Sequence, residues 1–193
     1  MSLGVLRLAS TSPQRRAILE QLQIPFDVVE PSYVEHDPPD ADPVALVRAH
    51  AEGKARSARQ DGRVTLGVDT TVHLDAKVYG KPADRLRAGE MLRALSGRTH
   101  VVVSGLCLLG PGFEATDTAE TKVTFRSLSE ADVETYLASG EWEGRAGGYA
   151  IQGLGGRLVE RSEGDYLNVV GLPGAALVAL LERHAPELLQ IRT

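Results

Sequence analysis

Residues 5–16 read Val-Leu-Arg-Leu-Ala-Ser-Thr-Ser-Pro-Gln-Arg-Arg, and they decide how the chain begins to fold. The apolar part, Val5–Ala9, predicts a short buried strand, and Ser12 followed by Pro13 is typical of a helix N-cap and first turn. We therefore expect a strand, a tight turn and a helix over residues 13–23. The start of this helix offers free N–H groups beside hydroxyls and two arginines, which suits an anion such as phosphate. The alternative is a capped surface helix with solvated arginines.

Outward from this segment, strand-like and helix-like stretches alternate, and a hairpin-rich part follows. The expected strands cover residues 26–30, 64–69, 100–109, 116–125 and 157–160, and a hairpin over 71–79 turns at Asp75-Ala76. The expected helices begin at Asp42-Pro43 and at Ser129, and cover residues 84–95 and 173–184. This alternation favours a mixed α/β fold with a cleft.

The composition excludes several classes of protein. The 193 residues are 42% hydrophobic and 24% charged with a net charge of -5, which rules out a collagen-like or largely disordered chain. The net acidity leaves no basic face for duplex nucleic acid or an anionic membrane, so we expect neither partner. We find no apolar run of membrane-spanning length and no signal-peptide pattern, so we expect a cytoplasmic protein. Cys107 lies in an apolar run and is predicted to be a buried core residue.

Three ionisable residues are candidates for chemistry. Asp69 ends a predicted strand, where open α/β sheets usually place ligands, and it could hold a metal, orient water, or simply cap the turn that follows. Lys81 lies in a Gly-Lys-Pro turn and is either a point charge for phosphate or a solvated lysine. Lys54 flanks the apolar stripe of its helix, so it either faces a cleft or extends to solvent.

Other signals are weaker. The glycines of residues 147–153 surround Gln152, which suits close approach of the backbone to a ligand or a tight structural loop. The glycines at 110 and 112 predict a hairpin turn rather than a dinucleotide-binding motif, because no helical pattern follows. The five histidines lack zinc-site spacing and belong to no visible nucleophile motif.

Several blocks together resemble the Maf family of nucleoside triphosphate pyrophosphatases. They are Leu8–Arg15, Lys54-Ala55, Gly67–Thr70, Gly80–Pro82 and Gly148–Gly153. The resemblance implies an elongated mixed β-sheet flanked by helices, with residues 1–193 forming one domain whose two lobes enclose a nucleotide-binding cleft. It further implies a homodimeric enzyme that hydrolyses nucleoside triphosphates to the monophosphate and pyrophosphate with Mg²⁺ or Mn²⁺.

The resemblance also implies roles for single residues. Asp69 matches the catalytic aspartate, either as a base or as a metal ligand, and Glu35 or Asp37 is the second metal-side candidate. The positions that match the phosphate site are Ser10, Arg15, Lys54 and Lys81, and the positions associated with specificity are Gln14, Thr70 and Gln152.

Two features bear on the substrate. The Asp69-Thr70 pair with Gln152 resembles the dTTP/UTP subgroup, whereas the 7-methyl-GTP subgroup usually has Asp-Gln at the first two positions. Gln14 stands where the family usually has Arg, and Arg16 lies about 100° around the helix from Arg15, so compensation by Arg16 does not follow automatically. The rival hypotheses are a nucleotide-binding regulator of cell division and an ITP-type purine pyrophosphatase.

Overall fold

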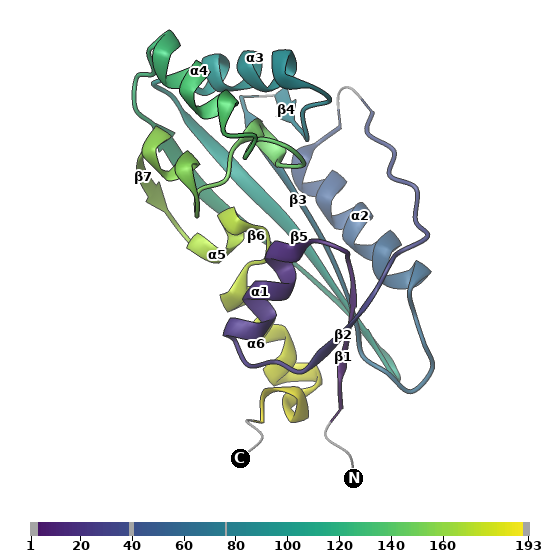
Figure 1. The fold of residues 1–193 in the computed structure, drawn as a ribbon. Helices are drawn as coiled ribbons and strands as arrows, with labels where there is room; N and C mark the ends of the chain where they lie inside the picture. The colour runs from purple at the N-terminus through teal and green to yellow at the C-terminus, as the bar shows by residue number, and fades with distance from the viewer. Residues whose placement is uncertain (1–3, 39–40, 76, 191–193) are drawn as a thin grey trace.

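The computed structural model describes residues 4–38, 41–75 and 77–190. A mixed seven-stranded sheet runs through it in the order β2-β1-β3-β5-β6-β7, and β4 pairs with β3 (Figure 1). The strands are β1 (Leu6–Ala9), β2 (Phe26–Val29), β3 (Thr65–Leu74), β4 (Lys77–Tyr79), β5 (Thr99–Gly110), β6 (Phe113–Phe125) and β7 (Val159–Glu163). The helices are α1 (Pro13–Gln21), α2 (Pro43–Ser57), α3 (Arg85–Leu95), α4 (Glu130–Ala138), α5 (Tyr166–Val170) and α6 (Gly174–His184). The expected elongated mixed sheet flanked by helices is thus confirmed.

The alternation of side chains along β5 separates the two faces of the sheet. Leu106 and Leu108 pack in a core cluster with residues of α1 and α6, whereas Cys107 and Leu109 pack against the alanines of α2. Helix α2 therefore covers one face, and α1 and α6 lie on the other, as Figure 1 shows. Cys107 is fully buried, as predicted, and burial raises the pKa of its thiol to about 12.

The face opposite α2 carries two separate hydrophobic clusters. The first includes Leu66 and Val68 of β3 with side chains of α1 and α6. The second includes Val72 and Leu74, farther along the same strand, with side chains of α3 and α4. The clusters lie at the two ends of one continuous sheet, and the intervening part of β3 separates them.

Helix α2 lies unusually close to the sheet because two glycines face it. A Cβ atom on Gly67 of β3 would lie 2.1 Å from the carbonyl oxygen of Ala51, and one on Gly105 of β5 would lie 2.4 Å from that of Val47. Real Cβ atoms do not approach backbone so closely, so only glycine fits at either place. This approach sets the polar side chains of α2 directly over the centre of β3.

We expect Gly67→Ala to destabilise the protein by about 3 kcal/mol, because neither the strand nor the helix backbone can yield cheaply. For a chain of this length that corresponds to a melting temperature roughly 6–12 °C lower. Gly80→Ala is the matched control, since a Cβ atom there meets nothing within 4 Å. Thermal unfolding followed by circular dichroism measures both, and equal melting temperatures would contradict this account of the helix approach.

The structure corrects three expectations. Asp69 does not end a strand: β3 continues to Leu74 because β5 pairs with it without interruption from Thr65 to His73. The predicted strand over residues 157–160 is shifted to β7, whose polar sequence shows no alternation, and follows a short 3₁₀ segment. Helix α5 was not expected, since five residues are too few for a helical period to show. The predicted turn at Asp75-Ala76 includes Ala76, which lies outside the described residues.

Candidate active site

The site forms where one edge of β3 is left open. The pairing of β1 with β3 ends at Gly67, and the pairing of β4 with β3 begins at Val72. Between them, within the described chain, residues 68–71 pair only with β5. Because side chains alternate along a strand, Asp69 faces α2 while Thr70 faces the side of α1 and α5. Groups from both faces of the sheet can therefore meet at this edge.

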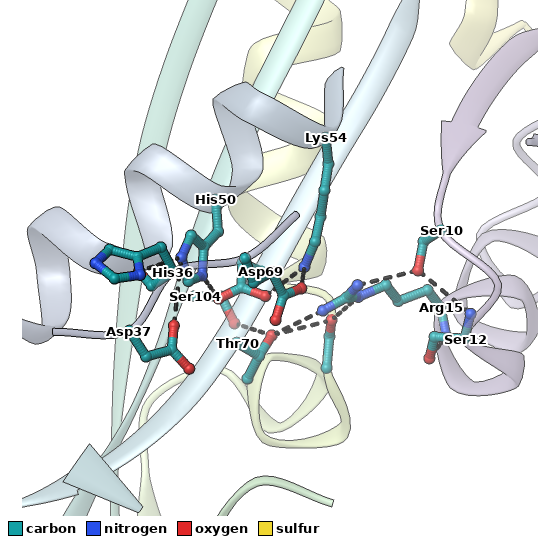
Figure 2. Close-up of polar contacts among 12 residues, drawn as sticks. Ser10, Ser12, Arg15, His36, Asp37, His50, Lys54, Asp69, Thr70 and Ser104 are labelled. Carbon is teal, nitrogen blue, oxygen red and sulfur yellow. Dashed lines mark hydrogen bonds and ion pairs between the residues drawn. The ribbon is translucent and has the colours of Figure 1, made fainter. Parts of the chain in front are cut away.

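A lysine joins two carboxylates on the α2 side. Lys54 Nζ lies 2.6 Å from Asp69 Oδ1 and 2.5 Å from Glu35 Oε1 (Figure 2 shows the first pair). The side chains of Lys54 and Asp69 are only 9% and 14% exposed, whereas that of Glu35 is 41% exposed. Burial acts to raise the pKa of Asp69, but the hydrogen bond from His50 and the charge of Lys54 outweigh it, and the pKa is lowered. Asp69 is therefore ionised at neutral pH.

His50 belongs to this cluster, and the sequence analysis missed it. Its Nδ1 atom donates to Asp69 Oδ2 at 3.3 Å, and its Nε2 atom donates to the backbone carbonyl of His36 at 3.3 Å, with Asp37 Oδ1 at 3.4 Å (Figure 2). Since both acceptors demand an N–H group, this geometry favours the imidazolium form, and the bond to Asp69 raises the pKa of His50. The sequence feature that could have identified His50 is its spacing from Lys54. His50 precedes Lys54 by four residues, so the two share one face of the helix.

The same groups could hold a metal ion. Glu35, His50 and Asp69 each offer one ligand atom, and these atoms lie within 4.8 Å of one another. The two carboxylates already converge on a cation, Lys54 Nζ, so the donor set fits a divalent ion. Carboxylates suit Mg²⁺ and Mn²⁺, while ligation by His50 would require one ring nitrogen to lose its proton.

On the side of the sheet opposite α2, three hydrogen-bond partners fix the Arg15 side chain. Its Nε donates to the carbonyl of Gly171 at 2.9 Å, and its terminal nitrogens donate to Ser10 Oγ at 3.0 Å and to Thr70 Oγ1 at 3.4 Å (Figure 2). Ser12 caps α1, as predicted, by accepting from the backbone N–H of Arg15. The guanidinium is therefore held rigidly at the start of α1.

Arg15 and Arg16 have different environments. Burial lowers the pKa of Arg15, and the charges of Asp69 and Glu35 act in the opposite direction, so the group stays cationic. Arg16 is exposed and does not line the hollow beside Arg15. The suggestion that Arg16 replaces the missing charge at position 14 thus finds no support in the geometry.

A hollow of about 320 Å³ brings most of the predicted residues together. Its lining includes Ser10, Gln14, Arg15, Glu35, Lys54, Thr70, Lys81 and Gln152. Asp69 and His50 line an adjoining hollow of about 460 Å³, which shares Glu35, Thr70 and Lys81 with the first. Arg145 adds a further cation to the first hollow, and its Nε is buried without a hydrogen-bond partner among the described residues. The arrangement is a cation-rich cleft beside a pair of carboxylates, which suits a polyphosphate.

Comparison with protein families agrees with this geometry. The family described as "Maf: Maf-like protein" matches residues 5–184 of the chain. The chain belongs to the Maf family. The matched segment contains every candidate residue of the Maf site, from Ser10 to Gln152.

Several curated relatives of this Maf chain carry the same name. A protein of Nitratidesulfovibrio vulgaris named dTTP/UTP pyrophosphatase is 47% identical over 92% of this chain and 86% of its own length. Proteins of the same name from Deinococcus radiodurans and Pyrococcus furiosus are 43% and 44% identical, over 90% and 91% of this chain and 90% and 93% of their own. Among solved structures, the Staphylococcus aureus Ham1 protein aligns over 62% of this chain and 71% of its own, with TM-score 0.43 and 12% identity. Within the described residues, no helix has the length and apolar character to cross a membrane.

Proposed function

We propose that this Maf protein hydrolyses nucleoside triphosphates, dTTP and UTP foremost, to the monophosphate and pyrophosphate. The observation that carries the proposal is the pair of carboxylates, Asp69 and Glu35, that converges on Lys54 beside a cleft lined by Arg15 and Lys81. The names of the curated relatives support the same reaction and the same substrates.

In this proposal each group has a separate task. Arg15, Lys54 and Lys81 neutralise the triphosphate and the departing pyrophosphate, and Ser10 with the N-terminus of α1 holds phosphate oxygens. Because its pKa is lowered, the Asp69 carboxylate is a weak proton acceptor. Its charge is better suited to orienting water and holding a cation than to abstracting a proton. A divalent cation, Mg²⁺ or Mn²⁺, would be held by Asp69 and Glu35 and would supply Lewis-acid polarisation of phosphate and water.

The specificity residues take different positions around the hollow. Gln14 Oε1 accepts from Ser12 Oγ at 3.0 Å, and the Thr70 hydroxyl is 2.8 Å from Ser104 Oγ as well as accepting from Arg15. We therefore propose that Thr70 acts through Arg15, whereas Gln14 and Gln152 present amide groups to the nucleotide. We further propose that residues 1–193 act as one unit in a cytoplasmic homodimer, as the family resemblance implies.

The proposal predicts that wild type prefers UTP to 7-methyl-GTP and that Gln14→Arg changes this preference. The ratio of the two kcat/KM values should change by at least about 10-fold, because a charge-assisted contact is worth about 1.5–3 kcal/mol. A wild-type preference for the methylated purine would overturn the subgroup assignment. An unchanged ratio in Gln14→Arg would show that position 14 only supports the start of α1.

Product analysis tests the reaction itself. With Mg²⁺ or Mn²⁺, we expect pyrophosphate and the monophosphate from UTP and dTTP, resolved by ion-exchange chromatography. Stepwise release of orthophosphate would indicate a phosphatase. Binding without turnover, with a panel of nucleotides and metals, would favour the regulator, and a preference for ITP would favour the purine enzyme.

A further inference from the structure

Glu35 lies on a segment that has no regular structure of its own. We call residues 31–38, which follow β2, the strap; none of them belongs to a helix or strand. Glu35 nevertheless reaches Lys54 Nζ at 2.5 Å. A partly exposed ion pair contributes little stability, while ordering eight residues costs much conformational entropy. Other contacts must therefore hold the strap.

Gly53 of α2 provides the first of these contacts. Glycine in the interior of a helix is unfavourable relative to alanine, and Gly53 adopts no left-handed backbone that would require it. A Cβ atom at this position would lie 2.3, 2.5 and 2.6 Å from the Cε2, Cδ2 and Cζ atoms of Tyr33. The missing side chain thus lets the Tyr33 ring lie directly on the helix backbone, one residue before Lys54.

His50 provides the second contact, one turn earlier on α2. Its ring lies 5.8 Å from that of Tyr33 between centroids, and its Nε2 donates to the carbonyl of His36. Tyr33 and His36 stand on either side of Glu35 along the strap. The strap is consequently fixed to α2 on both sides of the carboxylate.

We infer that Tyr33, seated on Gly53, is a positioning residue that places the Glu35 carboxylate at Lys54 and Asp69. This inference rests on the proposed function, because Glu35 is there assigned to the divalent cation. It explains why α2 has an unfavourable glycine directly before Lys54. Tyr33 itself contacts neither substrate nor reacting atoms in this scheme.

The test is a double-mutant cycle of Gly53→Ala and Tyr33→Ala, with Tyr33→Phe as the conservative control. Three quantities are measured: the rate of cleavage after Glu35 by a glutamate-specific protease, the affinity for Mn²⁺ without nucleotide by calorimetry, and kcat and KM for UTP. We expect each alanine variant to be cleaved at least about 10-fold faster after Glu35 and to lose at least about 10-fold in Mn²⁺ affinity and in kcat. KM should change less, and Tyr33→Phe should behave like wild type.

The double variant should lose no more than either single variant, because both changes release the same contact. The melting temperature of Gly53→Ala should be unchanged or higher, since alanine favours the helix. Wild-type cleavage, Mn²⁺ affinity and kcat in Gly53→Ala, or fully additive losses in the double variant, would overturn the inference. If wild type turned over no nucleotide, the proposed function would fail, while cleavage and Mn²⁺ affinity would still decide the role of Tyr33.

Discussion

We expect Asp69→Asn to lower kcat for UTP by at least about 100-fold. This is the lower end of the rate effect of a positioned acid–base group. Asparagine keeps the shape and one acceptor oxygen, so Lys54 or His50 can still donate to it. It removes the negative charge that lies 2.6 Å from Lys54 Nζ and that would hold a divalent cation. Because the phosphate contacts proposed for Arg15 and Ser10 do not involve Asp69, KM should change far less than kcat.

Asp75→Asn is the matched control, six residues farther along the chain. Asp75 has a left-handed φ of 54°, which asparagine tolerates, and its 77% exposed carboxylate pairs with Arg98 at the surface. Its kcat should stay within about 2-fold of wild type. Steady-state kinetics on both folded variants measure the contrast, and near wild-type turnover in Asp69→Asn would mean that Asp69 serves the structure alone.

The segment around Ser12 shows what the sequence could predict. Its capping residue, its proline and its apolar strand are local signals, and the structure contains the predicted strand, turn and helix. The hairpin of β5 and β6 is equally local, because the glycines at 110 and 112 mark the turn between two long strand-like stretches. Elements governed by neighbouring residues could thus be placed within a few positions.

The parts of the site that depend on distant contacts could not be placed in this way. Asp69 lies within β3 because β5 pairs with this strand from Thr65 to His73. The sequence of residues 64–75 alone does not indicate this pairing. His50 shares a helix face with Lys54, but its partners, Asp69 and the strap carbonyl of His36, lie 19 and 14 residues away. The proposed role of Gly53 depends on its contact with the ring of Tyr33, which is 20 residues away and is evident only in the structure. The sequence therefore identified candidate site residues by their type, but it did not predict which distant residues contact them.

Arg15→Lys tests whether a positive charge alone suffices at the start of α1. Lysine keeps the charge but cannot donate at once to Gly171, Ser10 and Thr70, as the guanidinium does. We expect kcat/KM for UTP to fall about 100-fold, the loss of roughly two charge-assisted hydrogen bonds, with KM raised.

The adjacent Arg16→Lys is the control for this change, because Arg16 is exposed and lies outside the hollow, and its kcat/KM should stay within about 2-fold of wild type. Inhibition by added pyrophosphate separates binding from folding: the inhibition constant should rise in Arg15→Lys and stay constant in Arg16→Lys. An unchanged inhibition constant with a lower melting temperature would mean that Arg15 only ties α1 to the segment after α5. Near wild-type kcat/KM in Arg15→Lys as well as in Arg16→Lys would mean that positive charge alone, rather than the fixed fork of Arg15, holds the polyphosphate.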